Sequence, residues 1–237
     1  MAVGAVARDL RPALVGVVFA TAATDEGTPA ATLPLNVSAP LRRMVEQLES
    51  LGASSIHVVT RPGCRELCER VLAGQPAVSV VESGDIADDL RLVGDLGSRS
   101  AGAAMVLALG DVVTSREAVA GLLRDPRVRT GALTGGARLA RPWAPRTKSV
   151  RGRIVSAASG YHSVRAPTGH FLGVLKVAAA DVPALAAAAA ELAVLARHRP
   201  STWEEVSAQR TERWSRRLAP PLGADGWPGP VLRPARL

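Results

Sequence analysis

The stretch LVGVVFATAATDEGTPAATLPLN, residues 14–36, joins an apolar run to a long polar loop. Leu14 to Ala20 is rich in valine and carries no charge, a pattern typical of a strand covered on both faces of a sheet. Thr21 to Asn36 is rich in Thr, Gly and Pro, which excludes a regular helix. A second apolar run, Ala103 to Leu109, ends in Gly110-Asp111. Together these runs predict two companion strands of an α/β domain.

The rest of the chain alternates strand patterns with helix patterns up to residue 124. Further strands are expected at 55–60, 77–81, 128–133, 154–158 and 170–177, and helices at 38–51, 62–73, 85–96, 115–124 and 181–197, with a loop over 134–148. Alternating strands and helices are the signature of a parallel sheet wound by right-handed crossovers. The sequence therefore predicts a three-layer α/β/α fold with a mostly parallel sheet.

The 237 residues are expected to form one α/β domain with two appended segments. We place a leader at residues 1–13, the domain at 14–199 and a Pro/Arg-rich tail at 200–237. The tail holds six prolines and one expected short helix, Trp203 to Leu218. Strand spacing becomes irregular after Asp111, so we expect the second half of the domain to be built differently from the first.

Charge is distributed unevenly along the chain. The net charge of +8 favours anionic partners, and residues 126–180 contain ten Lys and Arg but no Asp or Glu. Three interpretations of this basic segment stay open: binding of an acceptor phosphate, contact with anionic lipid, and a solvated Arg-rich loop. The segment has few aromatic residues for base stacking, which disfavours a nucleic-acid partner.

Thiols and apolar segments suggest no special chemistry. Cys64 and Cys68 lie four apart on one expected helix face, a poor geometry for a disulfide, and no His or Cys cluster nearby completes a metal site. No window reaches about 18 uninterrupted apolar residues, and we expect Val182 to Ala196 to be a packed helix. Residues 1–20 make a poor signal peptide. We expect a soluble, cytoplasmic protein.

Two parts of the chain, Leu14 to Thr60 and Ala104 to Val113, carry a family resemblance. A strand, a loop, a helix, the strand SIHVVT and a later strand ending in Gly-Asp resemble the nucleotidyltransferases that make nucleotide-sugars. Sugar-phosphate cytidylyltransferases and molybdenum-cofactor guanylyltransferases belong to this family. The resemblance, over roughly residues 13–197, implies a nucleotide-diphospho-sugar-transferase-like fold. It also implies nucleotidyl transfer from an NTP, with CTP as a candidate, to a phosphorylated sugar or polyol, releasing pyrophosphate.

The resemblance also implies site residues. In this family the amides of the first loop cradle the nucleotide phosphates, and the Asp that closes the later strand holds Mg²⁺. Asp111 is therefore the expected metal ligand and catalytic residue. The expected nucleotide-binding residues are Thr21, Ala22, Gly27, Thr28 and Gly110. The expected acceptor-binding residues are His162, Arg165 and Lys176, and Lys176 is also expected to be catalytic.

The first loop departs from the family pattern at the positions that carry positive charge. Pro29 and Ala30 stand where the family has Arg and Lys, the side chains that neutralise the triphosphate during attack. Asp25 and Glu26 instead make the loop acidic, and Ala22 replaces the first glycine. These departures support an alternative: a degenerate, non-catalytic nucleotidyltransferase-like module that binds a ligand or a protein partner.

Several residues have structural interpretations as well. Asp111 could cap a turn, Gly27 could shape the loop, and Lys176 could extend to solvent. His170 could line the acceptor pocket with His162, whereas His57 is expected in the core. Some proteins similar in this domain carry a membrane CDP-alcohol phosphotransferase domain behind it, so a separate membrane partner of that kind is a hypothesis.

Overall fold

The computed structural model of the chain describes residues 13–100, 102–136, 145–158 and 163–197. Its strands are β1 (Leu14–Ala20), β2 (Ala53–Thr60), β3 (Val78–Glu82), β4 (Ala104–Leu109), β5 (Gly131–Gly136), β6 (Arg146–Val150), β7 (Arg153–Ala157) and β8 (Gly169–Val177). Its α-helices are α1 (Pro40–Ser50), α2 (Arg65–Val71), α3 (Ile86–Arg99), α4 (Arg116–Arg124) and α5 (Val182–Arg197). Residues 1–12 of the expected leader 1–13, the tail 200–237 and the helix Trp203 to Leu218 lie outside the described residues.

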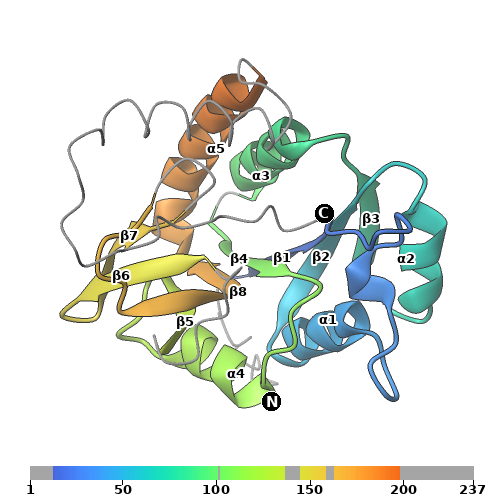
Figure 1. The fold of residues 1–237 in the computed structure, drawn as a ribbon, viewed down its shortest axis with the longest axis horizontal. Coiled ribbons are helices and arrows are strands. Elements are labelled where there is room, and N and C mark those ends of the chain that lie inside the picture. Colours follow the sequence, from blue (N-terminus) through green and yellow to red (C-terminus); the bar gives the residue numbers. More distant parts are fainter. Residues whose placement is uncertain (1–12, 101, 137–144, 159–162, 198–237) are drawn as a thin grey trace, which may run out of the picture.

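The described strands form one sheet in the order β3-β2-β1-β4-β8-β6-β7 (Figure 1). Strand β5 lies off this path and pairs with β8 from Gly169 to Lys176. The pairs β1–β2, β1–β4 and β2–β3 are parallel, and β8 runs antiparallel to β4. The predicted three-layer α/β/α fold with a mostly parallel central sheet is confirmed. The parallel pairs belong to the first half of the chain, and the strands after Asp111 add an antiparallel extension.

Helices cover both faces of the sheet, with α3 and α5 on one side and α1 and α4 on the other (Figure 1). Two apolar clusters fill the space between these layers. Val18 of β1 packs with residues of α1, α2 and α4, whereas Val17 packs with residues of α3 and α5. Neighbouring residues of β1 are thus buried on opposite faces, which explains its uninterrupted apolar sequence.

Gly110 holds the end of β4 against the end of β1. Its amide donates a hydrogen bond to the carbonyl oxygen of Phe19 at 2.8 Å. A Cβ atom at position 110 would lie 3.1 Å from that oxygen and 3.3 Å from Cβ of Ala31 in the first loop. A side chain there would require these neighbours to shift by a few tenths of an ångström, so glycine favours this approach, which sets Asp111 beside the loop that follows β1.

The antiparallel half contains a strand that the sequence did not indicate. Part of the segment expected to be a loop is β6, whose sequence RTKSV lacks an apolar alternation. It pairs with β7 through the two-residue turn Arg151-Gly152, in which both φ angles are positive, 51° and 76°. Such a turn matches the twist of a hairpin. The beginning of α1 also differs, because Ala39 and not Ser38 is its N-cap and Pro40 occupies its first position.

Helix α5 combines an apolar composition with a packed position. With the 3-10 turn before it, Ala179–Arg197 spans 19 residues at a mean hydropathy of 1.6, long and apolar enough to cross a membrane by length and composition alone. Such a helix is weak evidence of a span, and 22% of its most apolar window is buried. It packs closely on α3, because a Cβ at Gly97 would lie 3.1 Å from Cβ of Ala186. One face of α5 is therefore packed, as the sequence predicted, whereas Leu192, Val194 and Leu195 are about half exposed.

Candidate functional site

The first loop, residues 21–36, lies at the carboxyl edge of the parallel strands and is closed by its own hydrogen bonds. The amides of Thr24, Gly27 and Ala30 donate to the carbonyl oxygens of Thr28, Thr24 and Ala22 at 2.8, 3.0 and 2.8 Å. Gly27 has a φ of +79°, so it shapes the turn as a glycine must. The predicted contacts Thr21, Ala22, Gly27 and Thr28 therefore lie in or beside a small closed hairpin, and the amide of Gly27 already donates a hydrogen bond within it.

The tip of this hairpin is acidic. Asp25 and Glu26 are exposed. The neighbouring Thr24 side chain and the backbone amide of Glu26 lower the pKa of the Glu26 carboxyl, so it is ionised at neutral pH. Pro29, at the position of the family Arg, is buried, and its carbonyl oxygen accepts from the Thr32 hydroxyl at 2.7 Å. The position of the missing Arg is therefore a packed turn that supports the following 3-10 helix, Ala30–Thr32.

Asp111 extends into solvent beside this hairpin. Its side chain is exposed, and among the described residues no hydrogen bond or ion pair engages its carboxylate. The described part of the chain contains no group of three His, Cys, Asp or Glu residues that could enclose a metal ion. A Mg²⁺ ion needs no such group, because it is commonly held by one or two carboxylates together with substrate phosphates and waters. The single free carboxylate of Asp111 fits that mode of binding.

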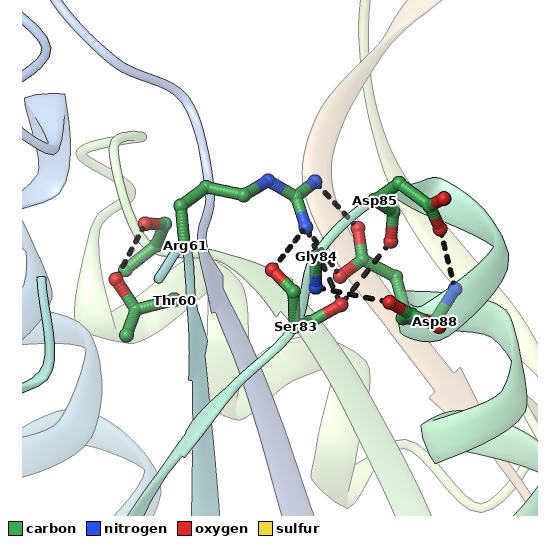
Figure 2. Close-up of polar contacts among 8 residues, drawn as sticks. Thr60, Arg61, Ser83, Gly84, Asp85 and Asp88 are labelled. Atoms are coloured by element: carbon green, nitrogen blue, oxygen red, sulfur yellow. Dashed lines mark hydrogen bonds and ion pairs between the residues drawn. The ribbon is translucent and has the colours of Figure 1, made fainter. Parts of the chain in front are cut away.

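The cation nearest to the ends of β2 and β3 is paired internally. Arg61 follows β2, and its two terminal nitrogens donate to the two carboxylate oxygens of Asp89 in α3 at 2.9 and 2.8 Å. One of these nitrogens also donates to the carbonyl oxygen of Ser83 at 3.2 Å. Figure 2 shows Arg61 reaching from the end of β2 toward Ser83 and α3. Sequence reasoning missed this pair, whose partners lie 28 residues apart, because no local pattern connects them.

The N-terminus of α3 is likewise closed to an anion. Asp85 is the N-cap, and its side chain accepts from the amide of Asp88 at 2.9 Å. The Asp88 carboxylate accepts from the amide of Gly84 at 3.1 Å (Figure 2). These carboxylates satisfy the amides that a phosphate would otherwise use and add negative charge. Of the positions considered at this edge, the first loop and Asp111 are the ones that stay available to the predicted nucleotide site.

Lys176 has a structural role far from Asp111. Its ammonium group donates to the carbonyl oxygens of Leu122, Leu123, Asp125 and Val128 at 3.3, 3.0, 3.5 and 2.6 Å. It therefore caps the C-terminus of α4 and the turn that follows. Lys176 is opposite Val106 in the β4–β8 register, five residues before Asp111, or roughly 16 Å along the strand. The predicted catalytic and acceptor-binding roles of Lys176 therefore disagree with the structure, in which its ammonium group is engaged and lies far from Asp111.

Of the other predicted acceptor residues, Arg165 lies in the described part of the chain and His162 does not. Arg165 is exposed. His170 is buried at 6% exposure at the start of β8, with no hydrogen-bond partner for Nδ1 among the described residues. His57, which was expected in the core, is half-buried. Its Nδ1 lies 2.8 Å from the Ser79 hydroxyl, and desolvation lowers the pKa of its imidazole.

The cysteines are free, as the sequence indicated. Cys68 is fully buried in the core beside Thr60, and burial raises the pKa of its thiol. Cys64 is half-buried at the start of α2. A buried thiol with a raised pKa is a packing group and not a nucleophile.

Two hollows in the described surface lie away from the carboxyl edge. One, of about 480 Å³, lies between α3 and α5 and is lined by Gly102, just before β4. The other, of about 390 Å³, is lined by Arg65 of α2 and Val78, the first residue of β3. Both therefore lie near the starts of parallel strands, whereas the candidate site lies at their ends.

Comparisons with known proteins agree with this architecture. The chain has a TM-score of 0.58 to the inositol-1-phosphate CTP transferase from T. maritima, at 16% identity over 73% of each chain. It has a TM-score of 0.59 to a structure from Bacillus anthracis assigned as a glucose-1-phosphate thymidylyltransferase in complex with a sucrose. That match has 13% identity over 86% of this chain and 83% of the other. No family model and no curated protein sequence matches. These likenesses show a sugar-phosphate nucleotidyltransferase-like fold.

Replacing Arg61 tests the pair at the ends of β2 and β3. We expect Arg61→Met to lower the free energy of unfolding by about 1 to 3 kcal/mol, because Asp89 would keep a nearly buried carboxylate without its partner. Arg65→Met is the matched control, since its pair with Glu69 is exposed and worth less than about 1 kcal/mol. Urea denaturation of both variants measures the difference. Equal losses would mean that the Arg61–Asp89 pair is not a stabilising contact.

Replacing Lys176 separates a structural from a functional lysine. We expect Lys176→Met to lower the free energy of unfolding by about 1 to 3 kcal/mol, because four carbonyl oxygens lose their common donor. Nucleotide binding, measured below the melting temperature, should keep its wild-type affinity. A variant of unchanged stability that no longer binds ligand would contradict the capping role.

Proposed function

We propose that this chain transfers a nucleotidyl group from an NTP to a phosphorylated sugar or polyol and releases pyrophosphate. The observation that carries the proposal is the free carboxylate of Asp111, held by Gly110 beside the first loop at the end of a central parallel strand. The fold similarity to a CTP transferase and a thymidylyltransferase supports the reaction class. CTP and a polyol phosphate are the substrates to test first, because inositol-1-phosphate and CTP are named for one of these structures.

In this proposal Asp111 holds Mg²⁺ together with phosphate oxygens of the NTP. The ion supplies charge neutralisation at the phosphates and eases the departure of pyrophosphate. The closed hairpin of the first loop then limits where the triphosphate lies, because its turn is fixed by internal hydrogen bonds. The acidic side chains of Asp25 and Glu26 disfavour a bare triphosphate and favour one that already carries a cation.

The acceptor half of the proposal rests on the basic segment. Arg165 remains the candidate for the acceptor phosphate among the described predictions, and His162 stays a prediction. Lys176 is left out of this role because its ammonium group is engaged with the C-terminus of α4. A cytoplasmic location and a separate membrane CDP-alcohol phosphotransferase are further proposals that rest on sequence alone.

A second candidate function is a non-catalytic module with the same fold. The specific observation in its favour is the first loop, in which Pro29 is packed and the exposed tip is acidic. A catalytic loop needs cations to stabilise the charge that develops on the triphosphate. Among the described residues the loop has none, and Arg61 close by is engaged with Asp89.

Thermal unfolding with each of CTP, UTP, GTP and ATP, with and without Mg²⁺, tests the proposed site. A ligand at about 100 times its dissociation constant adds roughly 2.7 kcal/mol, which raises the melting temperature by about 5 to 10 °C for a domain of this size. We expect such a rise with one nucleotide and only with Mg²⁺. Asp111→Ala should abolish it, because the metal loses its protein ligand.

The matched control is Asp95→Ala, which removes an exposed carboxylate from α3. It should keep the full Mg²⁺-dependent shift. The same shift in Asp111→Ala would place the nucleotide elsewhere. The absence of a shift with every nucleotide would reject the transferase and leave the non-catalytic module.

A further inference from the structure

The hairpin of β6 and β7 extends beyond the rest of the sheet. Only the first two residues of β6 pair with β8, Arg146 with His170 and Thr147 with Gly169. The remaining residues of β6 pair with β7 alone, and β7 is the edge strand of the sheet. In Figure 1 this hairpin lies at the left margin of the molecule. The outer part of the hairpin is therefore a two-stranded ribbon that pairs with no other described strand.

This ribbon is strongly positive. It carries Arg146, Lys148, Arg151 and Arg153, and all but Lys148 are exposed. Among the described residues none of the four forms an ion pair, and the chain has no Asp or Glu between positions 126 and 180. Within the described part of the chain, the charge of the ribbon is therefore not neutralised by an ion pair.

The ribbon also carries three aliphatic side chains that are exposed to solvent. Val150, Ile154 and Val155 are 48%, 41% and 58% exposed. In the β6–β7 register Val150 is opposite Arg153 and Ile154 is opposite Ser149, so the two pairs lie on opposite faces of the ribbon. Val155 lies at the bulge between Ile154 and Ser156, without an opposite residue. Apolar groups therefore emerge on both faces of the ribbon, and Val150 lies opposite the cation Arg153.

We propose that the β6–β7 hairpin, residues 146–157, docks on an anionic lipid surface. Cations attract anionic headgroups, and aliphatic side chains on both faces enter the boundary between headgroups and acyl chains. A bilayer interface can surround a ribbon tip, whereas a peptide would cover one face and leave the other in water. A second copy of the chain is disfavoured because two such hairpins repel each other. Nucleic acid is disfavoured because the described hairpin has no aromatic side chain for base stacking.

Flotation of the full chain with lipid vesicles tests the proposal. We expect the chain to bind vesicles of phosphatidylcholine with about one third phosphatidylglycerol at low salt, and to stay unbound with phosphatidylcholine alone. The double variant Arg146→Glu, Arg153→Glu should bind at least about 25-fold more weakly, since each Lys or Arg near the surface is worth about fivefold. A second variant, Val150→Ser with Val155→Ser, should also bind more weakly without changing the net charge.

The matched control is Arg43→Glu with Arg70→Glu, which removes the same charge from exposed positions on α1 and α2. It should keep wild-type binding, and far-UV circular dichroism should confirm that every variant is folded. Equal weakening in the control and in the hairpin variant would mean that only net charge matters, and would overturn the proposal. So would an absence of binding to anionic vesicles.

Soluble polyglutamate separates a lipid surface from an acidic protein. If the chain binds polyglutamate as tightly as anionic vesicles, and the serine variant binds both like wild type, the hairpin is a site for an acidic protein segment and the lipid proposal fails. Tighter binding to vesicles, reduced by the serine substitutions, supports it.

Discussion

The parallel pairing of β1 between β2 and β4 is the constraint on which the rest of this structure depends. The register runs from Leu14 opposite Ala104 to Phe19 opposite Leu109, so β1 and β4 end together. Gly110 then continues the contact through its hydrogen bond to Phe19 and its close approach to Ala31. Because of this pairing, the first loop and the carboxylate of Asp111 lie together at the carboxyl edge of the parallel strands, the edge at which open α/β sheets bind ligands.

The charges at the carboxyl edge of the parallel strands limit which ligands could bind there. The edge gathers carboxylates at the hairpin tip, at Asp111 and at the start of α3, while Arg61 is neutralised by Asp89. Such an edge is suited to a metal-bound nucleotide and poorly suited to a free one. The positive charge of the chain lies instead in its second half, on the β6–β7 hairpin, where it extends away from the sheet. The two halves of the molecule therefore have opposite electrostatic character.

Much of the fold could be predicted from the sequence, because burial on both faces leaves continuous apolar runs such as β1, and Ser115 caps α4 where the pattern indicated. Strand β6 could not be predicted, since its polar residues are ordered by pairing and by the Arg151-Gly152 turn. At the site, the edge position of Gly110-Asp111 followed from strand order, and the role of Asp111 stays a prediction. The capping by Lys176 depends on a β8 register that no local pattern determines.

The most direct test of nucleotidyl transfer is pyrophosphate release from CTP and Mg²⁺ with inositol-1-phosphate, measured for wild type, Asp111→Ala and Ala30→Lys. Ala30 is the position for restoring a loop cation, because Pro29 is buried and an arginine there would disrupt the turn. The account predicts release by wild type that requires the acceptor and is lost in Asp111→Ala. Release by Ala30→Lys alone, or by none of the three, would contradict it and identify a non-catalytic module with a nucleotidyltransferase-like fold.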